Sequence, residues 1–198
     1  LLGCERPLFL FDDDPDGFAS FLLLYRMVRA GKGSALKGSV LDERYAQRVN
    51  NYNPDLVVIL DKAEVSQEFF DEVNANCIWI DHHQVKQRNN VLYINPRTEN
   101  DNDNTATSLL AYNIAEEDEW IAAVGAVSDW QIPPQNILEK CEGLYDKKIT
   151  KPGKMLFTTK LGELAKIFSF NLKGKRSEVT ASIKILTRIN TPQELLEE

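Results

Sequence analysis

The sequence has 198 residues, of which 43% are hydrophobic and 27% charged, a balance typical of a soluble globular protein with one domain and at most a small extension. No apolar run approaches the roughly 18 residues of a membrane span, so we expect no membrane partner and no secretory signal. The three cysteines are odd in number and widely spaced, which favours a reducing, cytoplasmic location over a disulfide framework or a zinc cluster. The chain begins at Leu1 rather than Met, which fits an excised fragment.

The net charge of −7 is unevenly distributed. Residues 1–146 have a net charge of −13, whereas residues 147–188 contain eleven Lys or Arg and two Glu, a net charge of +9. An acidic body can hold cations, and a basic segment can hold an anionic polymer. The alternative is a pair of solvated basic helices with no ligand, and charge alone does not separate the two.

Short apolar runs alternate with helical patterns along the first part of the chain. The apolar runs predict strands at 7–11, between Asp55 and Asp61, at 77–80 and at 91–94. Helices are predicted at 18–30, stopped by Gly31-Lys32-Gly33, at 42–51 capped by Asp42, at 66–75 capped by Ser66, at 107–114 and at 119–127. The alternation predicts an α/β fold, a mostly parallel sheet flanked by helices on both faces, with a helical C-terminal segment.

Three of the predicted strands end in an aspartate, at Asp12, Asp61 and Asp81. Ligands of open parallel sheets bind beyond the carboxyl ends of the strands, so these carboxylates should share one edge. Four carboxylates also lie within residues 12–16. Like charges so close raise one another's pKa values unless a positive charge lies among them.

Four short motifs fall at these strand and helix ends: DDDPDG at 12–17, ILD at 59–61, IDHH at 80–83 and GAVSD at 125–129. Each alone is weak, because a strand-end carboxylate is often a helix cap and a His pair often lies on the surface. Together they are a stronger signal, since all four can face one crevice and both histidines of the chain lie in one of them. Aspartate and histidine without nearby cysteine suit Mn²⁺ or Mg²⁺ rather than structural zinc.

This ligand set predicts two divalent cations, Mn²⁺ by preference or Mg²⁺, roughly 3.5–4 Å apart, as in phosphoryl displacement. Asp61 would bridge them, and the cations would supply the positive charge that the acidic loop lacks. A shared water, ionised near neutral pH, would attack phosphorus. His83 would hold a phosphate oxygen or protonate the leaving group.

Arg97 follows the strand at 91–94, and its guanidinium could pair with a phosphate, although a surface charge beside acidic neighbours explains it as well. Thr105, Thr107 and Ser108 would cap the following helix or donate to phosphate, and capping is favoured.

The tail is predicted to be helical within 135–168, at 177–190 and from Thr191 onward. Lys173, Lys175 and Arg176 follow two phenylalanines, a mixture that suits a nucleic-acid single strand. Core aromatics beside surface cations are the alternative.

These motifs resemble the DHH phosphoesterase superfamily. The order of the DxDPDG loop, the strand ending in Asp, IDHH and GxVSD agrees, INPRTEND resembles the stretch that commonly follows, and the likeness covers about residues 7–131. The first motif is closer to RecJ-like nucleases, including archaeal relatives that associate with the replication machinery, than to inorganic pyrophosphatases or small oligonucleotide phosphatases.

The resemblance implies the metal ligands Asp12, Asp14 or Asp16, Asp61, His82 and Asp129. His83 would face the substrate phosphate, and Asp81 would be a ligand or would orient His82. Asp13 has no matching role and is expected to be solvated, and Lys62 is expected to point away from Asp61.

By the same resemblance, residues 1–131 form a DHH catalytic domain of a Mn²⁺- or Mg²⁺-dependent exonuclease acting on single-stranded DNA or RNA, with replication or repair proteins as partners. Two alternatives stay open: a phosphatase or phosphodiesterase for short oligonucleotides or dinucleotides, and a non-catalytic replication scaffold. RecJ-like proteins normally carry a second domain with a glycine-rich histidine motif, and residues 131–198 contain no such motif. Residues 132–198 are therefore interpreted as a basic extension or the start of a linker to a missing domain.

Overall fold

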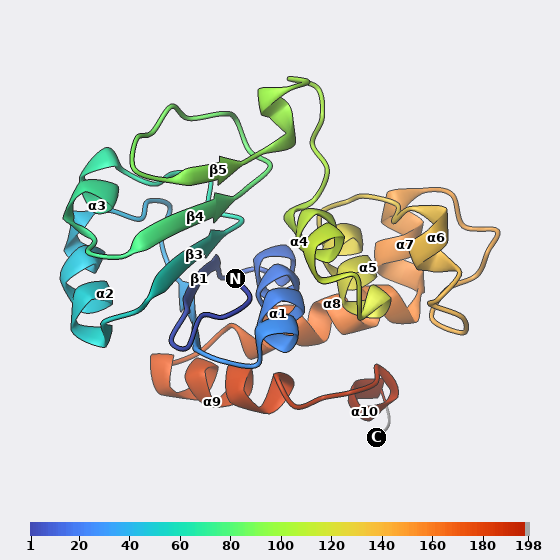
Figure 1. The fold of residues 1–198 in the computed structure, drawn as a ribbon. Helices are drawn as coiled ribbons and strands as arrows, with labels where there is room; N and C mark the ends of the chain where they lie inside the picture. Colours follow the sequence, from blue (N-terminus) through green and yellow to red (C-terminus); the bar gives the residue numbers. More distant parts are fainter. Residues whose placement is uncertain (197–198) are drawn as a thin grey trace.

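The computed structural model describes residues 1–196, and its centre is a five-stranded parallel sheet of order β2-β1-β3-β4-β5 (Figure 1). The strands are β1 (Leu8–Asp12), β2 (Lys32–Leu36), β3 (Leu56–Leu60), β4 (Asn76–Ile80) and β5 (Leu92–Ile94). The predicted α/β fold with a parallel sheet is confirmed.

Helices cover both faces of the sheet (Figure 1). On one face lie η1 (Glu43–Tyr45), α2 (Ala46–Tyr52) and α3 (Gln67–Glu72), and on the other lie α1 (Pro15–Val28), α4 (Thr107–Ala115) and α5 (Glu119–Ser128). Successive strand residues point to opposite faces of the sheet. Leu10 and Ile59 belong to the core under α2 and α3. Phe11 and Val58 belong to the core under α1 and α5. Both faces of the strands are buried, which explains their continuous apolar sequence.

The strand register aligns the carboxyl ends of four strands. Four residues occupy equivalent positions on the last paired rung: Phe11, Leu60, Ile80 and Ile94. The residues that follow them are therefore level with one another, and all four are polar: Asp12, Asp61, Asp81 and Asn95. The three strand-end aspartates share one edge of the sheet, as predicted.

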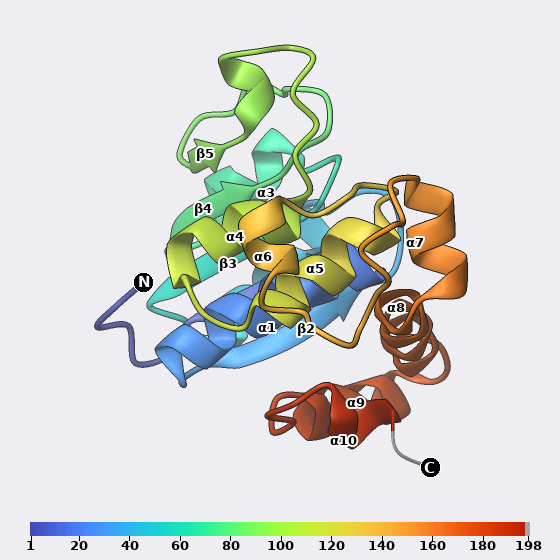
Figure 2. The same ribbon diagram turned by 90° about the vertical axis from the view of Figure 1, so that its right-hand side faces the viewer.

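The remaining helices follow the sheet in sequence: η2 (Pro96–Thr98), α6 (Gln135–Leu138), α7 (Pro152–Thr158), α8 (Lys160–Asn171), α9 (Arg176–Leu186) and α10 (Gln193–Leu196). Helix α8 contacts α1 and α5, and α9 lies against β2 (Figure 2). Phe168 is fully buried, with its ring 5.0 Å from that of Phe18, so it belongs to the core, whereas Phe170 is 75% exposed. Within residues 1–196, no helix is long and apolar enough to cross a bilayer.

In the first βα unit, one prediction is wrong and one strand was not predicted. Helix α1 begins at Pro15, before the predicted start, because Asp14 is its N-cap and accepts a 2.9 Å hydrogen bond from the Gly17 amide. Residues 32–36, expected to lie beyond a helix stop, form the edge strand β2. Its sequence, KGSAL, has little β propensity, and pairing with the buried β1 supplies the order that propensity does not.

Candidate metal centre

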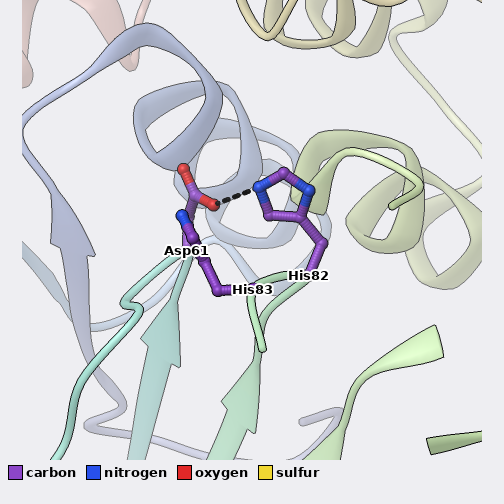
Figure 3. A group of neighbouring side chains, drawn as sticks. All are labelled: Asp61, His82 and His83. Atoms are coloured by element: carbon purple, nitrogen blue, oxygen red, sulfur yellow. Dashed lines mark ion pairs between the residues drawn. The ribbon is translucent and has the colours of Figure 1, made fainter. Parts of the chain in front are cut away.

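Asp61 lies at the middle of the sheet edge and is 1% exposed. Its backbone is left-handed, with φ of 56°, which for a residue with a Cβ costs of order 1 kcal/mol or more and is common at functional sites. Carboxylate Oδ1 accepts a 2.9 Å hydrogen bond from the Thr107 hydroxyl and lies 3.4 Å from Nε2 of His82 (Figure 3). Burial, reinforced by the charges of neighbouring aspartates, raises the pKa of Asp61 well above its usual range. A cation beside this carboxylate would allow it to ionise.

His82 is 8% exposed, and its two ring nitrogens face different groups. Nδ1 lies 3.0 Å from the carbonyl oxygen of Asn104, which only accepts, so we assign the proton to Nδ1. In the neutral ring, Nε2 then has a lone pair facing the Asp61 carboxylate. A backbone carbonyl that fixes the tautomer in this way is typical of a metal-binding histidine. Asn104, rather than Asp81, orients His82.

His83 is held by Asp81 through two hydrogen bonds. The His83 amide donates to Oδ2 at 3.0 Å, and ring Nδ1 lies 2.8 Å from Oδ1. Asp81 is fully buried, whereas the His83 side chain is 42% exposed. The hydrogen bond from Asp81 is the main cause of a raised pKa for His83. Nε2 of His83 is thus the ring nitrogen available to a substrate. In addition, Asp61, His82 and His83 each offer a potential metal-ligand atom, and these three atoms lie within 4.8 Å of one another.

Asp14 and Asp129 complete the group of carboxylates: Asp129 lies beside His82, and Asp14 lies beside Asp61 and Asp129. Asp129 follows α5, accepts from the Gln131 amide group at 2.9 Å and has Oδ2 3.7 Å from His82 Nδ1. Burial raises the pKa of Asp129, and it also raises that of Asp14, to which the charges of Asp12 and Asp129 add. The predicted residues of the first, second, third and fourth motifs therefore meet in one place.

Asp16 is 2% exposed and binds the N-terminus of α4. Its two oxygens accept from the amides of Thr107 at 2.8 Å and Ser108 at 3.2 Å. Burial raises the pKa of Asp16 to about 7. The expectation that Thr105, Thr107 or Ser108 caps α4 is wrong, because Asp16 satisfies the helix amides from a distant part of the chain and frees the Thr107 hydroxyl for Asp61.

Asp12 pairs with Lys62. Lys62 Nζ lies 2.7 Å from Asp12 Oδ1, it also donates to the carbonyl of Gly38, and the side chain is 3% exposed. The sequence raised the question of Lys62 only in relation to Asp61, but in the structure its ion pair is with Asp12. The signal that could have identified it was a lysine directly after a fully apolar strand and its terminal acid.

The basic residues predicted to bind substrate lie on two sides of the centre. Arg97 donates from Nε to the carbonyl of His82 at 2.8 Å and from a terminal nitrogen to the carbonyl of Asp101, so it braces the DHH loop. Lys173 Nζ lies 3.2 Å from the carbonyl of Asp13 and 3.8 Å from its carboxylate, at the rim of the acidic loop. Asp13 is thus beside a cation rather than simply solvated.

Arg176 lines a groove of about 220 Å³ between β2, α2 and α9, whereas Lys175 is the exposed N-cap residue of α9. Lys32 and Arg48 also line the groove, and its described lining residues include no Asp or Glu. Lys37, just after β2, donates to the carbonyl of Gly174, so the loop that carries Lys173 is tied to the carboxyl end of the sheet. A basic surface therefore adjoins the acidic centre.

The fold is an α/β fold with a parallel sheet, and buried aspartates and two histidines lie together at the carboxyl edge of that sheet. Such a protein has a candidate site for hard divalent cations. The model of the DHH family, N-terminal domain, matches residues 8–139, and the chain belongs to that family. Its fold is accordingly that of the DHH phosphoesterases. No curated protein matches the sequence.

Solved structures share the fold at low identity. RecJ from Thermus thermophilus in complex with Mn²⁺ matches with a TM-score of 0.55 and 15% identity, over 98% of this chain and 36% of that one. An exonuclease RecJ bound to manganese matches with a TM-score of 0.51 and 17% identity, over 98% of this chain and 63% of that one. The DHH domain of a protein assigned to a family of ribosomal proteins matches with a TM-score of 0.64 and 13% identity, over 98% of this chain and 57% of that one. The chain spans between about a third and two thirds of these proteins.

The donor set fits a divalent cation. Asp14, Asp61 and Asp129 are carboxylates with pKa values raised mainly by burial, and none of the three has a Lys or Arg ion-pair partner within residues 1–196. His82 presents its Nε2 lone pair to Asp61, and Asp129 lies on the Nδ1 side of the ring. Oxygen ligands with one imidazole suit Mn²⁺ or Mg²⁺.

Proposed function

We propose that this chain hydrolyses phosphodiester bonds of single-stranded nucleic acid, as a RecJ-like exonuclease, with Mn²⁺ or Mg²⁺ at the candidate metal centre. The observation that carries the proposal is the convergence of residues from four separate motifs. Asp61 faces Nε2 of His82, Asp129 lies on the Nδ1 side of the same ring, and Asp14 lies close to Asp61 and Asp129. Bound divalent cations would neutralise this cluster, polarise a phosphoryl oxygen and activate water.

His83 is the proposed acid of the reaction. Its hydrogen bond with Asp81 raises its pKa, so a larger fraction of the ring is protonated near neutral pH. With Nδ1 engaged by Asp81, Nε2 can donate to a phosphoryl oxygen or to the leaving oxygen. Asp81 is accordingly proposed as the residue that positions His83.

The proposed polymeric substrate is supported by the basic surface next to the centre. Lys173 lies at the rim of the acidic loop, and Arg176 lines the groove together with Lys32 and Arg48. Such a series of cations can follow a phosphate backbone away from the site of cleavage. An association with replication or repair proteins rests on the family resemblance, and a cytoplasmic location rests on the odd number and wide spacing of the cysteines.

End-labelled DNA and RNA of several lengths, incubated with the purified chain with and without Mn²⁺, test the proposal. We expect metal-dependent release of nucleotides from single strands, and loss of this activity in His82→Ala. Cleavage of dinucleotides with none of longer strands would instead indicate an enzyme for short oligonucleotides. No cleavage, together with no effect of Mn²⁺ on the melting temperature, would favour a non-catalytic scaffold, because a ligand of the native state must stabilise it.

A further inference from the structure

Lys62 is a buried cation inside a set of carboxylates. The residue is 2% exposed, and its ammonium contacts Asp12 Oδ1 at 2.7 Å and the carbonyl of Gly38. Burying an ammonium costs several kcal/mol unless it is paired and hydrogen-bonded, so this contact is a requirement of the fold rather than a chance encounter of surface chains.

The backbone around Lys62 fixes the direction of its side chain. Asp61 adopts a left-handed conformation, which turns the chain sharply after β3. The carbonyl of Lys62 then accepts a 3.0 Å hydrogen bond from the buried indole of Trp79. The lysine is thereby held under the end of β1, where Asp12 is the carboxylate within reach.

Asp12 differs in this respect from the other predicted ligands. Within residues 1–196, no Lys or Arg lies within 4 Å of the carboxylates of Asp14, Asp16, Asp61 or Asp129, whereas Asp12 has Lys62. The charge of Asp12 is therefore already compensated, and an approaching divalent cation would have to displace a buried ammonium to reach the bonded oxygen.

We infer that Lys62 is a built-in counter-cation that withdraws Asp12 from the metal ligands and leaves the centre to Asp14, Asp61, His82 and Asp129. The inference rests on the proposed function only in taking the centre to bind Mn²⁺. Lys62 is then a positioning residue, which holds Asp12 and leaves Asp14 to face the metal.

The test compares Mn²⁺ affinity by titration calorimetry in four forms of the full chain: wild type, Asp14→Asn, Asp12→Asn and the double variant Asp12→Asn/Lys62→Gln. The double variant removes both charges of the pair, so no unpaired ammonium remains buried. We expect its Kd for Mn²⁺ to stay within about threefold of wild type, whereas Asp14→Asn weakens binding by at least about tenfold. Equal losses in the two would show that Asp12 is a ligand and would overturn the inference.

Thermal unfolding in a chelator provides a readout that needs no metal. We expect Asp12→Asn and Lys62→Gln each to lower the melting temperature, and the double variant to lose less than the sum, because the two residues act as a pair. Additive losses would overturn the pairing. If wild type binds no Mn²⁺ while the coupling is present, the proposed metal centre fails and the ion pair stands as a purely structural contact.

Discussion

Nε2 of His82 and Oδ1 of Asp61 face each other at 3.4 Å, with Nδ1 of the same ring turned to the carbonyl of Asn104. Both atoms carry lone pairs, so their approach to this distance is favourable only when a proton or a metal ion lies beside them. His82→Ala should therefore weaken Mn²⁺ binding by at least about tenfold. His83→Ala, in contrast, should change Kd by only a few fold and reduce turnover. Calorimetry and initial rates distinguish the two, and a similar loss of Mn²⁺ affinity in both variants would assign His83 to the metal.

The Asp81–His83 pair predicts a shift in the pH profile. Asp81 is the main cause of the raised pKa of His83, so Asp81→Asn should lower that pKa. If protonated His83 is the acid, the alkaline limb of the rate profile moves to lower pH, and turnover falls by roughly 10²-fold. His83→Gln, which has no ionisable ring, should abolish the limb. An unchanged limb in Asp81→Asn would rule out this role.

The buried carboxylates predict that the metal-free protein loses stability as pH rises. Burial raises the pKa of Asp16 to about 7 and also raises that of Asp61, so the folded chain binds more protons than the unfolded chain between about pH 4 and 7. Stabilisation is then complete below the unfolded pKa and is lost as pH increases through the folded pKa. We expect the melting temperature in chelator to be several degrees lower at about pH 8 than at about pH 5.5. Mn²⁺ should raise it more at the higher pH, and a flat profile would contradict the prediction.

The groove beside β2 predicts a separation of polymer binding from chemistry. Arg48→Glu and Arg176→Glu should each weaken binding of single strands and reduce the salt dependence by about one charge. Hydrolysis of a small chromogenic phosphodiester, which does not reach the groove, should change little. Lys166→Glu is the matched control, because Lys166 is an exposed cation on α8 that does not line the groove. Equal effects of all three variants would show that the groove has no specific role and that only the overall charge of the protein affects binding.

Gly125 on α5 predicts a sensitive packing position behind the centre. A Cβ at Gly125 would lie 2.4 Å from the Ser108 hydroxyl oxygen and 2.8 Å from Asp16 Oδ1. Gly125→Ala should therefore destabilise the protein by about 1–3 kcal/mol and disturb the hold of Asp16 on α4. Gly153→Ala is the control, since a Cβ there meets only Trp130, at an ordinary 3.4 Å. Chemical unfolding of both variants gives the comparison, and equal stabilities would contradict the steric reason.

The sheet edge could be predicted from sequence because it depends on local features. Three of the four predicted apolar strands end in an acid, and parallel strands bring their carboxyl ends to one edge, so Asp12, Asp61 and Asp81 were expected to be neighbours. The edge strand β2 could not be predicted in this way, since its order comes from pairing with β1 and not from its own residues.

The contacts that distinguish one aspartate from another were not predictable, because they join distant segments. Asp16 binds α4 amides 91 and 92 residues away, and Lys62 reaches Asp12 across 50 residues. Sequence motifs identify which carboxylates gather at the edge, but tertiary packing decides which of them are already occupied by a helix end or an ammonium.

The left-handed backbone of Asp61 bears on whether the chain has kept its chemistry. Glycine or asparagine adopts such a conformation more readily, and either would also remove a buried carboxyl group. In a lineage that had become a passive scaffold, mutational drift at position 61 would therefore raise the stability of the chain. An acid at a buried position with a left-handed backbone is what selection for its carboxylate oxygens would produce.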